Sequence, residues 1–263
     1  MNRPAKLSLA WIFFILTASV CVWSFFSAAA QNMDFPQALQ TPSPRYLFGT
    51  DSLGRDLFLR TLAGARVSLG VAFVAVFLST LLGVFFGLVS GYYGGKTDKA
   101  IMSFTDAALC FPSFFLMLSM IAVFGPGILN VMLILGFTGW MGTARLVRAE
   151  VLSLREREFI LAARVIGAKD SRIIFRHLLP NTAGLIFVNA VLGISGAILA
   201  ETALSFLGIG VQPPTPSWGN ILADGKATLG AAWWLTLFPG LFIFLTVLSV
   251  NVFGEYLRER QHS

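Results

Sequence analysis

Two acidic side chains inside apolar segments are the first candidates for chemistry in this sequence. Glu201 lies within SGAILAETALSFLG, and Asp106 lies near the start of another long apolar segment. An ionisable group at membrane depth faces protein or water, because lipid exposure is costly, and it marks a candidate functional site. Two interpretations stay open for both residues: a position on a translocation path, or a structural role with the carboxyl group hydrogen-bonded.

Other combinations of reactive side chains do not form a site. The sequence Gly94-Gly95-Lys96-Thr97 is similar to the end of a phosphate-binding loop, but Ser90 stands where that loop requires a glycine, and the segment follows an apolar helix instead of a strand. His177 and His262 are the only histidines, and no nucleophile lies beside a base. We therefore expect no catalytic residue, no metal site and no cofactor bound by this chain.

The composition is that of an integral membrane protein. Hydrophobic residues make up 56% of the chain and charged residues only 12%, and the mean hydropathy is +0.76. The net charge of +6 comes from basic residues that border apolar segments, which excludes nucleic-acid binding in favour of membrane orientation.

Six continuous apolar segments are long enough to cross a bilayer as helices, which takes about 20 residues each. Continuous apolar segments exclude a transmembrane β-barrel, whose strands alternate. The sequence predicts an all-α, polytopic protein with six transmembrane helices. Their approximate bounds are Leu7 to Ala30, Val67 to Tyr92, Ala100 to Phe124, Ile128 to Val147, Ala183 to Ile209, and Ala232 to Tyr256.

The basic residues predict that both termini face the cytoplasm. With the N-terminus inside, fourteen of the nineteen Lys and Arg residues fall on the inner side. The inner set is Arg3, Lys6, Lys96, Lys99, Arg145, Arg148, Arg155, Arg157, Arg164, Lys169, Arg172, Arg176, Arg258 and Arg260; the outer set is Arg45, Arg55, Arg60, Arg66 and Lys226. A signal peptide cleaved after Ala28-Ala29-Ala30 is the alternative for the first segment, whose length favours a retained anchor.

The chain divides at residue 66 in this interpretation. Residues 1–66 comprise the anchor and an external loop, in which an amphipathic helix from Asp51 leads into the membrane or contacts an external partner. Residues 67–263 comprise the core. Within it, Gly83, Gly87 and Gly91 form a stripe for close helix packing, inside this chain or against a second subunit. Pro112 predicts a kink in the third segment.

A polar, basic segment, Glu158 to Pro180, interrupts the apolar pattern between the fourth and fifth segments. Its pattern predicts two short helices separated by a turn at Gly167, within an inner loop of residues 150–182. Ala162 and Ala163 provide a small-residue patch that a partner can fit. The alternative is a surface loop held to anionic lipid by its arginines.

This loop resembles the coupling loop of membrane permease subunits of ABC importers. That family's pattern is Glu-Ala-Ala, three residues, Gly, nine residues, Ile, one residue, Leu-Pro. Ala162, Ala163, Gly167, Leu179 and Pro180 match it, whereas Leu161 replaces the glutamate and His177 the isoleucine. The resemblance implies contacts to an ATPase from the matching residues and from Glu158, Arg164 and Ala168, with Glu158 in place of the missing acid.

Further matches resemble the peptide/nickel class of these permeases, and specifically the second of its two membrane subunits. They are FGTDSLGRDLFLRTLAGARVSL, GYYGG with Asp98, ETALSFLGIGV and PPTPSWGNIL. The resemblance implies a multi-pass subunit of the bacterial inner membrane. Its implied partners are a homologous permease, two ATP-binding subunits that carry ATP and Mg²⁺, and an external solute-binding protein.

The implied mechanism is alternating access driven by ATP hydrolysis in the partner subunits. Peptides are the expected substrate, with nickel or metal chelates as the alternative. A secondary transporter would show inverted repeats and more intramembrane charge, and a membrane enzyme would show a cluster of titratable residues. Neither pattern is present in the sequence.

Overall fold

The computed structural model describes residues 3–226 and 228–262, which are almost entirely helical. An isolated bridge between Thr50 and Asp56 is the only β-pairing within those ranges. The elements in chain order are α1 (Arg3–Gln31), η1 (Phe35–Gln37), α2 (Leu57–Tyr93), α3 (Gly95–Leu109), α4 (Ser113–Phe124), α5 (Ile128–Leu154), α6 (Glu158–Val165), α7 (Asp170–Ile173), η2 (Ile174–Leu178), α8 (Leu179–Phe206), α9 (Trp218–Lys226) and α10 (Trp234–His262).

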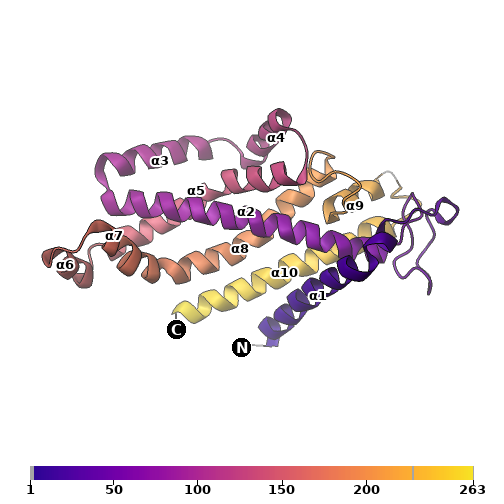
Figure 1. Ribbon diagram of the computed structural model, residues 1–263, viewed down its shortest axis with the longest axis horizontal. Coiled ribbons are helices and arrows are strands. Elements are labelled where there is room, and N and C mark those ends of the chain that lie inside the picture. Colours follow the sequence, from indigo (N-terminus) through magenta and orange to yellow (C-terminus); the bar gives the residue numbers. More distant parts are fainter. Residues whose placement is uncertain (1–2, 227, 263) are drawn as a thin grey trace.

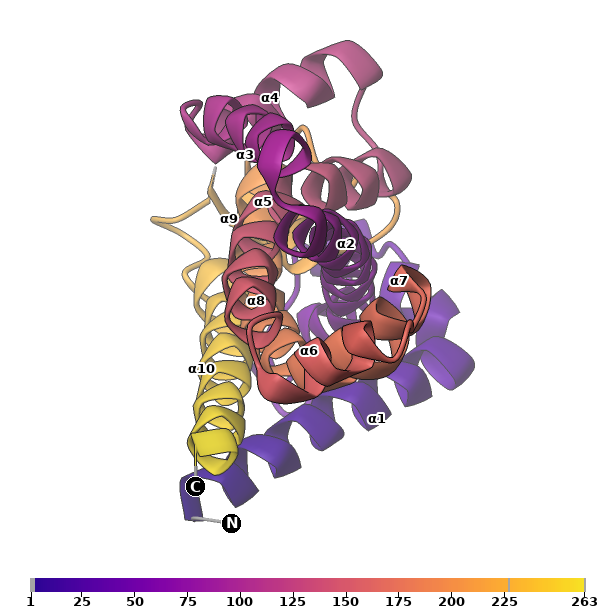
Figure 2. The ribbon, with the colours of Figure 1, turned by 90° about the vertical axis from the view of Figure 1, so that its left-hand side faces the viewer.

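The long helices run along the length of an elongated bundle (Figure 1). The short helices α6 and α7 protrude at one end, and the loop between α1 and α2 lies with α9 at the opposite end. The two chain ends lie near each other, where α1 and α10 pack together (Figure 1). Viewed end-on, α6 and α7 lie across the inner ends of α2 and α8 (Figure 2).

Within the described ranges, four helices are long and apolar enough to span a membrane by themselves: α1, α2, α7 to α8 taken as one, and α10. A fifth span results if α3 and α4 count as one broken helix. Their axes differ by 86° across the break that contains Pro112. The kink predicted at Pro112 is therefore confirmed, as a full break. The segment Ile128 to Val147 lies within the 27-residue α5, which is not among these candidates, so a count of six is not confirmed.

Helices α2 and α5 pack closely and run in the same direction. A Cβ atom added at Gly83, Gly87 or Gly91 would lie 2.5, 2.7 and 2.8 Å from the Cβ atoms of Thr143, Val147 and Val151, respectively. Each step of four residues on α2 is thus matched by a step of four on α5. The glycine stripe packs within this chain, where van der Waals contact between close backbones holds membrane helices together.

We expect Gly87→Leu to lower the thermal stability of the protein strongly. The new Cβ would also lie 2.8 Å from the carbonyl oxygen of Ala144, so the two helices must separate along this seam. Overpacking of this kind costs about 3 kcal/mol when backbone must move. Gly142→Leu is the matched control, because a Cβ at that position on α5 meets nothing within 4 Å. Equal unfolding temperatures in detergent for the two variants would contradict the assignment.

One helix start predicted from the sequence is wrong. No separate amphipathic helix begins at Asp51. The helix begins at Leu57, where the Asp56 carboxylate accepts hydrogen bonds from the N–H groups of Phe58 and Leu59, and it continues through Tyr93. The division proposed at residue 66 therefore falls inside α2. The residues before Leu57 form a turn because the Asp51 side chain is bonded to the turn's own backbone.

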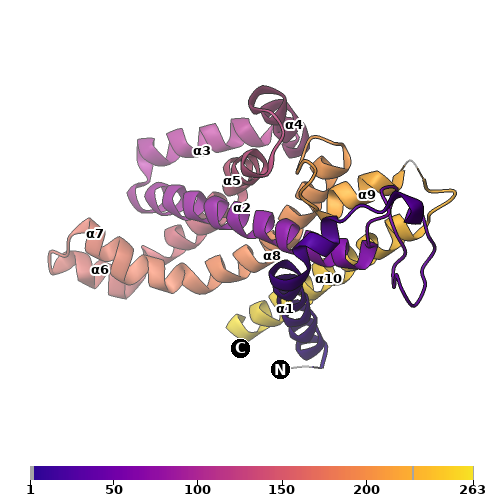
Figure 3. The same ribbon diagram turned by 45° about the vertical axis from the view of Figure 1, so that its right-hand side comes forward.

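Helix α1 belongs to the same packed bundle as the rest of the chain. Figure 3 shows it crossing α2 and α10 at an angle. Buried side chains from α1, such as Ile15 and Val22, pack with Leu62 on α2, Ile198 on α8 and Phe242 on α10. This cluster fixes α1 against the half of the bundle that contains the start of α2.

Candidate functional site

The inner loop consists of α6, a turn at Gly167, and a helical segment that leads into α8. Gly167 has a φ of +78°, a left-handed conformation that glycine adopts without strain. The chain then continues through α7, the π-helical η2 and α8 without interruption. The second short helix expected in this loop is therefore not a separate helix, because it runs on into α8. Pro180 is the second residue of α8 and directly follows the π-helical turn η2, where the backbone hydrogen-bond pattern departs from that of an α-helix.

An apolar cluster attaches this loop to the membrane helices. Ile160 and Ala163 on α6, together with Ile173 and Leu178, are buried. They pack against the inner ends of two helices, at Leu88 and Tyr92 of α2 and at Val147 and Val151 of α5. The loop therefore packs against both helices of the α2–α5 seam. A displacement of α6 would be transmitted to both of them.

Polar contacts to the inner end of α2 reinforce the apolar attachment. The Tyr92 hydroxyl donates a hydrogen bond to the Asp170 carboxylate at 2.6 Å, and the Arg164 guanidinium lies 5.5 Å from the centre of the Tyr92 ring. Arg155 donates to the backbone carbonyl of Gly91 at 3.3 Å. These contacts fix α6 and α7 on either side of Tyr92.

The loop presents an apolar tip to the surroundings. Val165 and Ile166, just before the Gly167 turn, are 86% and 83% exposed, and Phe175 is 67% exposed. The apolar pattern of this segment predicts that Ile166 packs against another helix, and its exposure shows that this prediction is wrong. The sequence does contain a pattern that could indicate an exposed apolar surface here, namely two β-branched residues, Val165 and Ile166, directly before a turn glycine. Apolar surface of this kind marks a contact with another protein.

The residues matched to the coupling pattern divide between this surface and the interior. Glu158, Ala162, Arg164, Gly167 and Pro180 are exposed, Ala168 and Leu179 are half-buried, and Ala163 is buried. Of the two adjacent alanines, Ala162 therefore faces the surroundings and Ala163 faces the bundle. Leu161, at the position of the family's acid, is 43% exposed.

We expect Tyr92→Phe to weaken the mechanical link between the loop and α2 without unfolding the protein. The ring stays in the apolar cluster, and one hydrogen bond to a carboxylate is lost, a contribution of about 1.5 kcal/mol. The measurement is uptake per ATP hydrolysed in the assembled transporter, which should fall. Tyr93→Phe is the control, since the Tyr93 side chain is 55% exposed. An unchanged ratio in Tyr92→Phe would contradict the role.

Ion pairs join α3 to α5 beside the loop. The Asp98 carboxylate accepts from the Arg148 guanidinium, with one distance of 2.6 Å, and from the Ser90 hydroxyl. Asp106 pairs with Arg145, and both side chains are largely exposed. Asp106, a candidate for the translocation path, thus lies at the surface of this chain, next to the face that α3 shares with α5.

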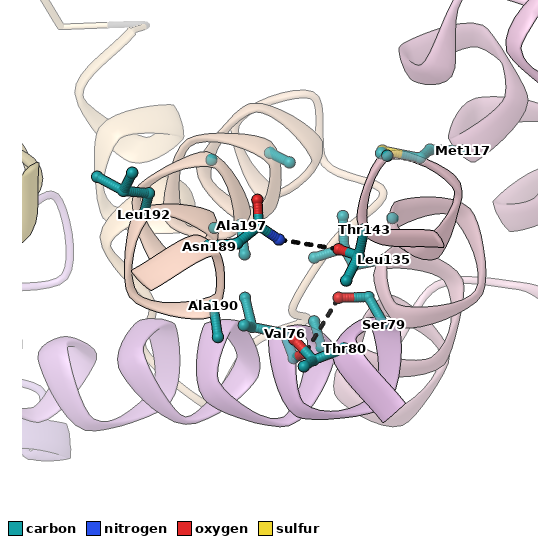
Figure 4. Close-up of a pocket in the computed structure, with 16 residues that line it drawn as sticks. Val76, Ser79, Thr80, Met117, Leu135, Thr143, Asn189, Ala190, Leu192 and Ala197 are labelled. Carbon is teal, nitrogen blue, oxygen red and sulfur yellow. Dashed lines mark hydrogen bonds between the residues drawn. The ribbon is translucent and has the colours of Figure 1, made fainter. Parts of the chain in front are cut away.

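A cavity of about 300 Å³ lies between α2, α5 and α8 (Figure 4). Its lining is mostly small or polar, and the side chains of Ser79 and Thr80 on α2, Thr143 on α5 and Asn189 on α8 face one another. Asn189 donates a hydrogen bond to Thr143 at 3.0 Å. Small residues leave room, and amides and hydroxyls can exchange hydrogen bonds with a polar solute, so this is a candidate segment of the path.

Glu201 lies outside that cavity and has no exposed surface. Its carboxyl oxygens accept hydrogen bonds from the hydroxyls of Ser68 at 2.8 Å and Ser205 at 2.7 Å. Those hydroxyls in turn accept from the N–H groups of Trp218 and Val211. The network joins α2, α8 and the connection between α8 and α9, and it supports the structural interpretation of Glu201.

We expect Glu201→Ala to destabilise the fold by about 2–4 kcal/mol. The change leaves two buried hydroxyls without an acceptor and opens a small cavity. Thermal unfolding of the purified protein measures the loss, and Glu201→Gln, which keeps the volume and one acceptor, should lose less. Full stability of Glu201→Ala combined with lost transport would favour a path role instead.

A buried ion cluster at the outer end was not identified from the sequence. Asp51 accepts from Arg55 Nε at 2.7 Å and also pairs with Arg60, while Asp224 on α9 lies 3.3 Å from Arg60 Nη1. Burial raises the pKa of Asp51, but the Arg60 guanidinium, the Arg55 N–H and the Arg55 guanidinium outweigh it and hold that pKa below its usual range. The cluster fastens the turn before α2 to α9.

Comparison with known proteins agrees with this arrangement. The family described as "Binding-protein-dependent transport system inner membrane component" matches residues 83–263. The oligopeptide transport system permease protein OppC of Haemophilus influenzae is 40% identical, over 98% of this chain and 84% of its own. The glutathione transport system permease protein GsiD of Escherichia coli is 41% identical, over 98% and 86%.

Solved structures share the fold at low sequence identity. A chain of the MetNI methionine ABC transporter in an inward-facing conformation superimposes with a TM-score of 0.61 at 18% identity, over 77% of this chain and 97% of that one. The chain belongs to the family of binding-protein-dependent transport system inner membrane components. It is a multi-pass permease subunit of an ABC importer and not the ATP-hydrolysing component.

Proposed function

We propose that this chain forms one half of a peptide translocation path and that the surface around Val165 and Ile166 seats in an ATP-binding subunit. The observation that carries the proposal is the inner loop, whose exposed apolar tip is attached through buried packing to α2 and α5. Relatives at about 40% identity are named as oligopeptide, dipeptide and glutathione permeases. All three of these named cargoes are peptides. Peptide is therefore the favoured cargo over nickel or metal chelates.

The proposed topology has six spans and both termini in the cytoplasm. Because α2 and α5 run in the same direction, α3 and α4 together must return the chain across the membrane between them. Helix α5 then crosses as the fourth span, although Arg145 and Arg148 make its inner half polar. The fourteen inner cations support this orientation.

In the proposed mechanism, two ATP-binding subunits carry ATP and Mg²⁺. Binding of ATP brings these two subunits together, and hydrolysis lets them separate again. Their movement shifts α6, and the cluster around Tyr92 transmits the shift to the α2–α5 seam beside the cavity. A homologous permease supplies the other wall of the path, and an external solute-binding protein delivers the peptide. ATPase contacts come from Glu158, Ala162, Arg164 and Gly167 together with the apolar tip.

The test is uptake by the assembled transporter in proteoliposomes. With ATP inside and peptide-loaded binding protein outside, labelled oligopeptide should accumulate, and a non-hydrolysable nucleotide should stop it. Asn189→Leu should lower peptide uptake while ATP-binding subunits still co-purify, since Asn189 faces the cavity and lies far along α8 from the loop. Accumulation of a nickel chelate with no peptide uptake would overturn the choice of cargo.

A further inference from the structure

Arg66 carries a charge that no carboxylate of the described chain balances. Its guanidinium lies over the ring of Trp23 on α1, 3.9 Å from the ring centre, and it takes part in none of the ion pairs of the described residues. The other arginines near the start of α2, Arg55 and Arg60, are buried in ion pairs with Asp51. Stacking uses only the face of the guanidinium, so its edge N–H groups stay available to an acceptor.

In the proposed topology, Arg66 lies near the outer face of the membrane. Two residues further along α2, Ser68 bonds Glu201, which lies little more than one turn before the outer end of α8. Ile128, the first residue of α5, lines the same cavity as Arg66. Trp23 is 52% exposed, and tryptophan concentrates at the level of lipid headgroups. Phosphate groups of the outer leaflet lie at this depth.

Two cavities meet at Arg66. One, of about 400 Å³, is lined mainly by apolar side chains and also contains the polar side chains of Gln31 and Thr215 beside Arg66. The other, of about 350 Å³, extends deeper between α1, α2 and α10 and is lined mainly by apolar side chains, including Leu16, Phe73 and Val250. Gly70 lines both, and a Cβ added there would meet nothing within 4 Å, so the two cavities adjoin at Arg66 and Gly70 with open space beside the glycine. We call the two together the groove.

We propose that this groove binds an anionic phospholipid of the outer leaflet, with its phosphodiester on Arg66 and an acyl chain along α1 and α2. Arg66, Gln31 and Thr215 gather polar groups at one end of the groove, and the rest of its lining is mainly apolar, which matches a headgroup joined to an acyl chain. The guanidinium provides charge-assisted hydrogen bonds to the phosphate. Neither cavity is lined by an acidic side chain that would receive the ammonium of a zwitterionic headgroup. A net negative headgroup such as phosphatidylglycerol is therefore favoured.

The experiment is native mass spectrometry of the transporter purified from vesicles containing equal amounts of phosphatidylglycerol and phosphatidylethanolamine. The wild-type assembly should retain phosphatidylglycerol with about tenfold preference, because the ammonium of phosphatidylethanolamine would lie near the Arg66 cation with no acidic partner in either cavity. Arg66→Gln should remove most of this preference, and Arg66→Lys, which keeps the charge, should restore part of it. Gly70→Leu should reduce retention of both lipids, because its side chain fills the groove while Arg66 remains.

Two control variants separate the site from general effects. Arg45→Gln removes an exposed external arginine that also lies over an aromatic ring, that of Tyr46, outside the groove. Gly240→Leu adds the same side chain at another open helical glycine. Both should retain phosphatidylglycerol as the wild type does. An equal loss of phosphatidylglycerol from Arg45→Gln would overturn the proposal. So would an Arg66→Gln variant that retains lipid as the wild type does but loses a neighbouring membrane subunit.

Discussion

Replacing Ile166 by aspartate should abolish ATP-driven uptake while leaving the permease inserted and folded. Ile166 is 83% exposed and lies at the tip of the inner loop, so the substitution removes no packing within this chain. In the proposed function, this side chain is buried against an ATP-binding subunit. Losing that apolar contact and burying a charge costs about 3 kcal/mol, or roughly a hundredfold in affinity.

The measurement combines co-purification of the ATP-binding subunits with uptake in proteoliposomes. Ile166→Leu keeps the apolar contact and should retain both activities. Tyr92→Phe should give a different result from Ile166→Asp. The ATP-binding subunits should still co-purify with Tyr92→Phe, and only the uptake per ATP hydrolysed should fall. Normal assembly and uptake in Ile166→Asp would exclude the tip as the docking surface, while the family membership of the chain would stand.

The second large effect is expected from Asp51→Asn at the outer end. Asp51 has no exposed surface and lies between two guanidinium groups, those of Arg55 and Arg60, which are 7% and 5% exposed. Removing its charge leaves both cations buried with only Asp224 nearby. Breaking a buried ion pair in this way costs about 3–5 kcal/mol, and we expect a large fall in the unfolding temperature.

The effect of Asp51 has a defined pH dependence. Its folded pKa is lowered, so its contribution is fully present above the unfolded value of about 3.9 and is lost as pH falls through the folded pKa. The difference in unfolding temperature between wild type and Asp51→Asn should therefore be constant near neutral pH and shrink below about pH 4. Asp34→Asn, in the same loop, is the control, because the Asp34 side chain makes no capping hydrogen bond. A pH-independent difference would contradict the ion-pair account.

Local patterns predicted some features of the site well. Gly167 was expected at a turn, and its positive φ has the conformation that a turn glycine provides. The break at Pro112 follows from the missing N–H of proline. In both cases the cause lies in the residue itself, so the sequence is sufficient.

Features that depend on distant residues were not predictable in the same way. The amphipathic pattern from Asp51 suggested a helix, but the Asp51 side chain bonds the backbone of Leu53 and Arg55 and stabilises a turn instead. The exposed tip was missed because burial of Ile160 and exposure of Ile166 depend on how α6 lies on α2 and α5. Propensity alone does not determine which face of a short helix is covered.

The sequence by itself determined the class of this protein: an all-helical membrane permease with a loop that matches a known pattern. Hydropathy, charge placement and motif spacing are local or additive properties, so they follow from the order of the residues without knowledge of their contacts. The tertiary structure decided the rest. It placed the glycine stripe against α5 and enclosed Glu201 in a hydroxyl network, and it left Arg66 without a counterion at the edge of a groove. These outcomes depend on which residues from separate helices meet, and close packing fixes those contacts only when the whole bundle is assembled.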